Sequence, residues 1–156
     1  MPKNIPVIGL EEIGILVSVV EMDNGELRVR CMQESGSGYI WTEPPSDDQP
    51  SWQNAHFHKG VRETYIVQRG MMAFAEKSEK GAYNVELFCK GEIVTSSLGC
   101  QHNVYLFAGS AIHTVKHGTP VGNPEKGGAD WYPADSDFDN WTKQITEKVI
   151  LDLLET

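Results

Sequence analysis

The feature that most constrains the fold of this chain is a series of short apolar segments, most of them closed by glycine or a polar turn. Each segment has the length and composition of a β-strand. Parallel strands need long crossover connections, and most of these connections are too short to hold a helix. The pattern therefore predicts an all-β body built as an antiparallel sandwich or barrel. The predicted strands span residues 13–22, 26–32, 55–59, 63–68, 71–76, 83–89, 92–96, 103–108 and 111–117.

The length of 156 residues is usual for one domain, and we expect a single domain over residues 1–156. The stretch TEPPSDDQPS, residues 42–51, is rich in proline and acidic residues and predicts a loop. Beyond residue 118 the pattern changes, and apolar residues at four-residue spacing predict a short amphipathic helix near the C-terminus. This stripe consists of Trp141, Ile145, Val149 and Leu153, with Ile150 and Leu154 beside it.

The charge of the chain excludes one class of partner. Lys and Arg number 13 against 22 Asp and Glu, which gives a net charge of -9, and no basic surface for nucleic acid is expected. The longest apolar run, IGILVSVV at 13–20, is too short for a membrane helix and lacks the basic start of a secretory signal. Three widely spaced cysteines predict no disulfide framework. These features favour a cytoplasmic protein with no membrane partner.

The segment AHFHKGVRETYIVQRG, residues 55–70, gathers several side chains that can bind a metal. Side chains alternate along a strand, so His56 and His58 lie on the same face and can converge on one point. Glu63, in the next predicted strand, is a third candidate ligand. Gly70 ends the segment where a turn needs a positive φ or a close backbone approach.

These four residues match the pattern H-x-H-x4-E-x6-G without a gap, and the pattern resembles the first signature of the cupin superfamily. Residues 91–106, GEIVTSSLGCQHNVYL, are similar to the second cupin signature, G-x5-P-x-G-x2-H-x3-N. Gly91, Gly99 and His102 are in place, whereas Ser97 replaces the proline and Leu106 the asparagine.

The resemblance covers about residues 52–117, with N-terminal strands over 13–32 and a loop and helix over 118–156. It implies a cupin-type double-stranded β-helix, which is an antiparallel jelly-roll barrel, here with a short C-terminal helix.

The resemblance also implies a divalent transition metal, with four protein ligands. These ligands are His56, His58, Glu63 and His102. Three imidazoles and one carboxylate suit Fe, Mn, Ni, Co, Cu or Zn, and affinity order does not select among them. The alternative is a set of hydrogen-bonded pocket residues. A competing alignment uses His113 as the fourth ligand, but it places Ala108 and Ser110 at the proline and glycine positions, so His102 is preferred.

Two further residues are candidate catalytic groups. Tyr65 lies beside the first signature and could donate a proton. His113, on the last predicted strand, could act as an acid/base group or could be a hydrogen-bonded histidine of the core or rim, and the same two alternatives apply to His117 on the same face. Cys100 precedes His102 closely, but cysteine is more often a small buried residue than a ligand.

The cupin fold hosts many reactions, so the function must come from the site. The first hypothesis is a metal-dependent isomerase or epimerase that acts on a small polar or anionic metabolite, such as a sugar or sugar phosphate. The alternatives are an iron-dependent dioxygenase and a ligand-binding or sensory cupin without turnover. We expect a small-molecule ligand, and also a homodimer, because the apolar run 13–20 would otherwise form an exposed sheet edge.

Overall fold

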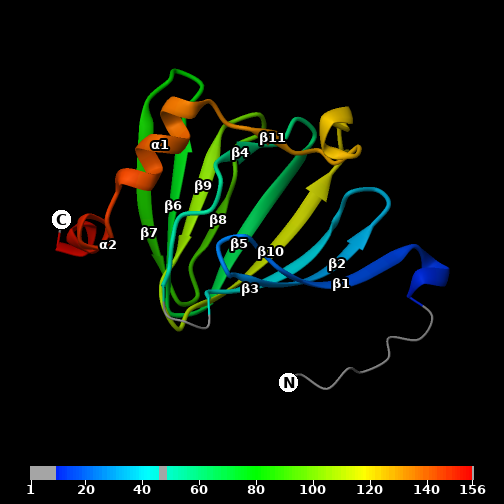
Figure 1. Ribbon diagram of the computed structural model, residues 1–156, viewed down its shortest axis with the longest axis horizontal. Helices are drawn as coiled ribbons and strands as arrows, with labels where there is room; N and C mark the ends of the chain where they lie inside the picture. The colour runs from blue at the N-terminus through cyan, green and yellow to red at the C-terminus, as the bar shows by residue number, and fades with distance from the viewer. Residues whose placement is uncertain (1–9, 46–48, 156) are drawn as a thin grey trace.

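The computed structural model describes residues 10–45 and 49–155, which fold into two antiparallel β-sheets followed by short helices (Figure 1). The strand order is β1-β2-β3-β10-β5-β8 in the six-stranded sheet and β11-β4-β9-β6-β7 in the five-stranded sheet. The strands are β1 (Ile15–Glu21), β2 (Leu27–Gln33), β3 (Gly38–Glu43), β4 (His56–Phe57), β5 (Val61–Arg69), β6 (Met71–Lys77), β7 (Tyr83–Cys89), β8 (Ile93–Thr95), β9 (His102–Leu106), β10 (Ala111–Gly118) and β11 (Tyr132–Pro133). The helical segments are η1 (Glu11–Ile13), η2 (Pro124–Lys126), α1 (Ser136–Gln144), α2 (Glu147–Leu151) and η3 (Asp152–Glu155).

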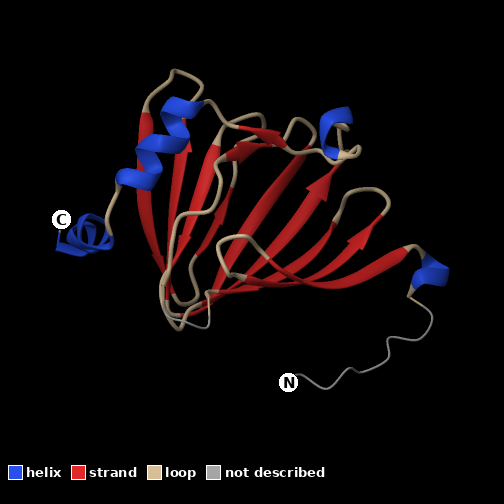
Figure 2. Cartoon of the chain, in the orientation of Figure 1, coloured by secondary structure: helices blue, strands red, loops and turns tan. Residues whose placement is uncertain are grey.

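The two sheets approach each other at one end and diverge at the other (Figure 2). Within the described residues, no strand ladder joins one sheet to the other, so the sheets are not closed into a barrel. The predicted all-β, cupin-type jelly roll is confirmed in its antiparallel strands and its two sheets, while the barrel stays open.

Buried and exposed side chains alternate along β5, and the buried ones form part of the inner face of the six-stranded sheet. Val61, Glu63, Tyr65 and Val67 are buried, whereas the residues between them are exposed or partly exposed. The apolar members of this face meet the inward side chains of β6, β9 and β10. This cluster consists of Tyr65, Val67, Met72, Phe74, Val104, Leu106 and Ile112. It lies between the sheets and holds β5 against the strand that carries His102.

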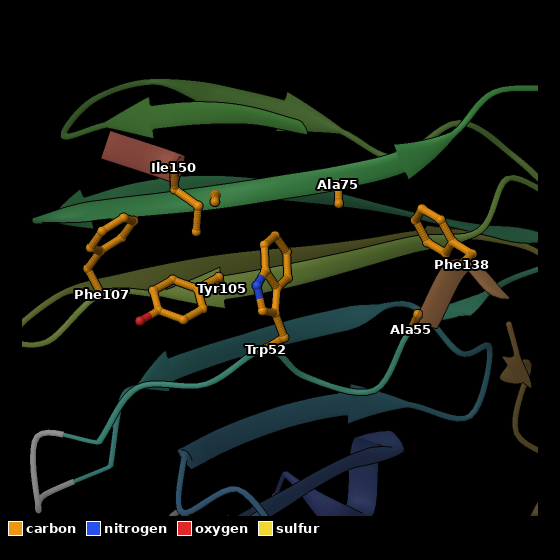
Figure 3. Close-up of a cluster of buried hydrophobic side chains, with 8 residues drawn as sticks. Trp52, Ala55, Ala75, Tyr105, Phe107, Phe138 and Ile150 are labelled. Atoms are coloured by element: carbon orange, nitrogen blue, oxygen red, sulfur yellow. The ribbon is translucent and has the colours of Figure 1, made fainter. Parts of the chain in front are cut away.

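Strand β9 is buried on both faces. Val104 and Leu106 face the cluster between the sheets, as alternation predicts. Tyr105 and Phe107 point the other way, yet they are also buried, because the C-terminal helices cover that side of the five-stranded sheet. The second core is shown in Figure 3 and consists of Trp52, Ala55, Ala73, Ala75, Tyr105, Phe107, Phe138 and Ile150. A strand packed on both faces is a rigid support for a side chain at its end.

Strand β3 was not among the strands predicted from sequence. It pairs with β2 on one side and β10 on the other, and so joins the N-terminal hairpin to the rest of the sheet. In its sequence, GYIWTE, the three apolar residues are consecutive rather than alternating and are followed closely by two prolines, which hides the strand from a local pattern. The predicted loop 42–51 therefore starts too early, and its residues 46–48 lie outside the described part of the chain.

The C-terminal apolar stripe forms two helices rather than one. Ile145 has an extended backbone and ends α1, and the Thr146 side chain accepts a hydrogen bond from the Val149 backbone N–H to cap α2. The break turns the second half of the stripe away from the sheet, so Val149, Leu153 and Leu154 are exposed. Ile150 and Phe138 are fully buried, and Trp141 and Ile145 of the stripe pack against the same core while partly exposed.

The apolar run 13–20 forms the end of η1 and most of β1, at one edge of the six-stranded sheet. Leu16, Val17 and Val19 are exposed on this edge strand. No helix in residues 10–45 and 49–155 has the length and apolar content needed to cross a membrane.

Gly70 separates β5 from β6 with a backbone φ of +71°. A Cβ at this position would lie 2.2 Å from Ser110 Oγ, a contact that no side chain can accept. That same hydroxyl accepts a 2.9 Å hydrogen bond from the Met71 backbone N–H. Both reasons given for glycine from the sequence, positive φ and close approach, are confirmed.

Candidate metal centre

Four buried side chains converge where the two sheets face each other. His56 lies in β4 and pairs directly with His102 at the start of β9, while Glu63 extends from β5 in the opposite sheet. His58 lies in the short connection between β4 and β5. One ligand atom from each of the four residues can be chosen so that all lie within 4.8 Å of one another. The predicted ligand set is thus brought together from both sheets.

The three histidines surround a single carboxylate oxygen. Oε2 of Glu63 lies 3.6 Å from Nε2 of His56 and 3.1 Å from Nε2 of both His58 and His102. The centre therefore consists of three imidazole nitrogens and one carboxylate oxygen, all directed at a common point.

The other ring nitrogen of each histidine faces a backbone carbonyl. Nδ1 of His56 lies 3.0 Å from the Asn54 carbonyl oxygen, and Nδ1 of His102 lies 3.1 Å from that of Cys100. Nδ1 of His58 contacts the Asp130 carbonyl oxygen. A carbonyl oxygen accepts and does not donate, so each Nδ1 carries the proton. Each Nε2 atom faces the Glu63 carboxylate.

Three imidazole nitrogens grouped with a carboxylate oxygen form a set of ligand atoms that a cation can bind. Burial, with the neighbouring His102, lowers the pKa of His56 to about 4, so this ring is neutral at pH 7. His58 Nε2 is buried and makes no hydrogen bond within the described residues. Unpaired buried polar atoms are costly, whereas a transition metal would accept all four donors at once. The residues present therefore fit a divalent metal better than a purely hydrogen-bonded pocket.

The Glu63 carboxylate is held in its ionised form. Burial by itself would raise its pKa, but the positive charge of Lys116 is foremost among the neighbouring groups that hold the pKa well below the usual value. Lys116 Nζ lies 3.2 Å from Oε1 and the Tyr65 hydroxyl donates a 2.5 Å hydrogen bond to Oε2. Burial and the Glu63 charge raise the pKa of Tyr65 well above its usual value, so its O–H stays protonated.

Residues 129–131 brace the centre from a distant part of the sequence. The Asp130 carboxylate accepts hydrogen bonds of 2.8 to 3.0 Å from the backbone N–H groups of Lys59, Gly60 and Val61, and so orders the connection that carries His58. The Trp131 ring stacks on His56, with centroids 5.4 Å apart. The orientation of two of the histidines thus depends on this segment.

A cavity of about 420 Å³ adjoins the centre and is lined by His56, Glu63 and Tyr65 among others. Its walls come from β2, β3, β5 and β10 of the six-stranded sheet and from the segment 120–131. The volume lies in the range of pockets that hold small molecules.

The structure does not bring His113 to the centre. On β10, Ile112, Thr114 and Lys116 line the cavity, while His113 lies on the opposite face of the sheet. Its Nδ1 contacts the Tyr39 hydroxyl and its ring packs near Trp41. This position gives no support to the predicted acid/base role of His113. Tyr65, in contrast, lines the cavity, and its catalytic role stays a prediction.

Two other residues considered from sequence lie outside the centre. His117 is exposed, and its Nε2 lies 3.1 Å from Thr64 Oγ1. Cys100 is buried, and it takes part through its backbone carbonyl rather than its thiol.

Sequence reasoning missed several residues around the cavity. Lys116 lies between His113 and His117 in the sequence, but alternation along β10 puts it on the opposite face of the strand, where it contacts Glu63. Arg28 and Arg30 alternate with Leu27 and Val29, a two-residue period that signals two polar side chains on one face. For Asp130 and Trp131 no local signal exists, because their contacts are with residues some 70 positions earlier.

The antiparallel jelly roll with a buried centre of three histidines and one glutamate defines the chain as a protein of cupin fold. No protein-family model matches the sequence, and no curated protein sequence matches it either. Among solved structures, Bacillus subtilis oxalate decarboxylase is similar with a TM-score of 0.59 at 11% identity, covering 90% of this chain and 35% of the other. The present chain thus spans about a third of the length of that protein.

Two shorter proteins match over most of their own length. Pac13, described as a unique nucleoside dehydratase, has a TM-score of 0.53 at 13% identity, covering 76% of this chain and 84% of the other. The cupin domain of Drosophila melanogaster CENP-C has a TM-score of 0.53 at 11% identity, covering 70% and 82%. At such identities the likeness establishes the fold and leaves the activity open.

Proposed function

We propose that this chain is a metal-dependent enzyme that acts on a small polar or anionic metabolite, such as a sugar or sugar phosphate, in an isomerase-like or epimerase-like reaction. The observation that carries the proposal is the convergence of three imidazole Nε2 atoms on one buried, ionised carboxylate oxygen. The adjoining cavity supports a small-molecule substrate.

The ligand set would be His56, His58, Glu63 and His102. A divalent ion bound there would supply Lewis-acid polarisation of a substrate oxygen. The carbonyl contacts at each Nδ1 hold the imidazoles in the tautomer that binds a cation. Tyr65 keeps its proton at neutral pH and can donate a hydrogen bond to an oxygen in the cavity, at the atom that now contacts Glu63.

Metal analysis of the protein purified without added metal tests this proposal. We expect close to one transition-metal ion per chain, and a strong loss in His58→Ala with the β-rich circular dichroism spectrum retained. His117→Ala is the matched control, because this histidine is exposed and its metal content should equal that of the wild type. A wild-type protein that stays metal-free after incubation with each candidate ion would contradict the proposal.

An iron-dependent dioxygenase is the second candidate, favoured by the same donor set. Four protein ligands on an octahedral ion leave two positions open, which suits oxygen together with a substrate. A metabolite screen on the iron-loaded protein separates the two candidates. Stoichiometric oxygen consumption would identify a dioxygenase, turnover without oxygen consumption would support the isomerase-like reaction, and tight binding without product would indicate a sensory protein.

A further inference from the structure

Two arginines of β2 extend into the cavity beside the metal centre. Arg28 and Arg30 line it together with Met32, while Leu27, Val29 and Cys31 alternate with them on the strand. Arginine on the inner face of a sheet is expensive to bury, because the charge loses water. Each of these two arginines therefore needs a neighbouring anionic group that offsets the lost hydration of its charge.

Arg28 has an internal partner. Its Nη2 lies 3.1 Å from Oε2 of Glu26, which is 1% exposed and also accepts hydrogen bonds from Gln53 Nε2. The charge of Arg28 is therefore balanced within the fold, although its Nε is buried without a hydrogen-bond partner. The ion pair with Glu26 fixes the direction of this guanidinium.

Arg30 has no such partner. The one hydrogen bond that its side chain makes among the described residues is a weak contact of 3.6 Å from Nη2 to Met22 Sδ, and its Nε is buried without a partner. Within residues 10–45 and 49–155, no carboxylate lies at ion-pair distance from Arg30. Burial and the neighbouring Arg28 lower its pKa, which shows that its surroundings disfavour the charge, yet an arginine stays protonated in proteins.

The remaining charges of the cavity do not supply the missing anion. Glu63 is engaged by Lys116 and the three histidines, and the Asp130 carboxylate is engaged by three backbone N–H groups. Lys126 adds a further positive charge above the Trp131 ring. In the wall formed by Arg28 and Arg30, the Arg30 guanidinium is thus a positive charge with no carboxylate at ion-pair distance among the described residues.

The sheet register relates this wall to the metal centre. Arg30 pairs with Ile40, Ile40 with Thr114 and Thr114 with Tyr65, so one row of inward side chains runs from the arginine to the tyrosine that contacts Glu63. Three inter-strand steps of about 4.8 Å place the Cα atoms of Arg30 and Tyr65 about 14 Å apart. Both side chains extend into the cavity, so a small metabolite can reach both ends.

We propose that Arg30, supported by Arg28, binds an oxyanion group of the substrate, either a carboxylate or a phosphate, while another polar group of the same molecule lies at the metal centre. As a statement about the substrate, this inference rests on the proposed function. It narrows the substrate class to small metabolites with an anionic group remote from the reacting oxygen. The planar guanidinium offers paired N–H donors that match both kinds of oxyanion.

Isothermal titration calorimetry with two probes, inorganic phosphate and malonate, tests the oxyanion site. At low ionic strength we expect the wild type to bind at least one probe saturably, and the preferred probe identifies the anion as phosphate or carboxylate. Arg30→Gln should weaken that binding about tenfold to a hundredfold, because it removes charge-assisted hydrogen bonds. Arg62→Gln removes the same charge from an exposed position on β5 and should bind as the wild type does.

Metal content, measured on the same samples, separates this inference from the proposed function. We expect Arg30→Gln to retain the metal content of the wild type, and His58→Ala to lose metal while still binding the anion. If His58→Ala abolishes anion binding and Arg30→Gln does not, the anion binds at the metal and the inference is wrong. Absence of saturable binding of both probes to the wild type would also overturn it. A wild type without metal that still binds the anion through Arg30 would overturn the proposed function and leave the oxyanion site standing.

Discussion

Lys116 Nζ lies 3.2 Å from Oε1 of Glu63, and the two residues are direct partners in the antiparallel register of β10 and β5. The lysine thus holds one oxygen of the carboxylate while the three imidazoles face the other. The Glu63 side chain is 7% exposed and that of Lys116 is 16% exposed, so solvent screens this pair poorly. The cross-strand pair stabilises the ionised carboxylate when no cation does so.

The ion pair between Lys116 and Glu63 predicts that a bound metal ion compensates for the stability lost when Lys116 is replaced. Lys116→Met should lower the free energy of unfolding of the metal-free protein by about 3 kcal/mol, because it leaves a buried carboxylate unpaired. In the metal-loaded protein the loss should be much smaller, since a bound cation balances the same charge. Urea unfolding with chelator and with saturating metal measures both values. Lys143→Met, at an exposed ion pair with Asp139, is the control, and equal losses in the two conditions for Lys116→Met would contradict the prediction.

His102 and His113 are the two candidates for the fourth metal ligand, and the structure predicts opposite results when each is replaced by alanine. His102→Ala should empty the metal centre, because its Nε2 lies beside Glu63. His113→Ala should keep the metal, because this ring lies across the sheet against Tyr39. Mass spectrometry of the metal content under native conditions measures both. Loss of metal in His113→Ala alone would show that the sequence alignment through His102 is wrong.

The cap of α1 predicts a stability effect that depends on pH. Asp135 accepts a 2.8 Å hydrogen bond from the Phe138 backbone N–H and forms an exposed ion pair of 2.6 Å with Lys77. The lysine and the Phe138 N–H lower the pKa of Asp135 to about 2. A carboxylate whose pKa is lowered by folding stabilises the protein above its unfolded-state pKa of about 4, and this contribution falls away as the pH drops toward 2.

Asp135→Ala should therefore cost about 1 kcal/mol at pH 7, mainly from the lost cap, because the ion pair is screened by solvent. The difference from the wild type should shrink as the pH is lowered from 4 toward 2, as measured by urea unfolding at each pH. Asp135→Asn keeps a capping oxygen and should cost less than the alanine variant at pH 7. A difference that grows at low pH would contradict the assignment.

The exposed edge of β1 leads us to propose the homodimer expected from the sequence. Leu16 and Val19 are each 59% exposed on a strand that pairs with β2 alone among residues 10–45 and 49–155, so its other edge can pair with the same strand of a second copy. Light scattering at micromolar concentration should give the dimer mass for the wild type and the monomer mass for Val19→Lys. Val149→Lys, at an exposed position of α2, is the control and should stay dimeric. A monomeric wild type would remove the proposal.

Local sequence patterns predicted most of the strands, and the resemblance to the cupin signatures implied the candidate ligand set. Alternation puts Glu63 on the buried face of β5, because side-chain direction depends on the backbone of the strand itself. The strand predicted over residues 55–59 is shorter in the structure, since β4 spans His56–Phe57, and His58 reaches the centre from the connection that follows. The positive φ of Gly70 follows from the same local geometry. Strand β3 escaped this reasoning, because its pairing with β2 and β10 outweighs a weak apolar pattern.

The sequence by itself therefore determined the period of each strand and the residue types that could bind a cation. The tertiary structure decided which of these residues meet. Lys116 reaches Glu63 through the register of two strands, the Asp130 carbonyl orients His58 from 72 positions away, and His113 is turned away from the cavity by its place on β10. Such contacts depend on which strands pair and which sheet faces are covered, and these are set by burial over the whole chain rather than by neighbours in sequence.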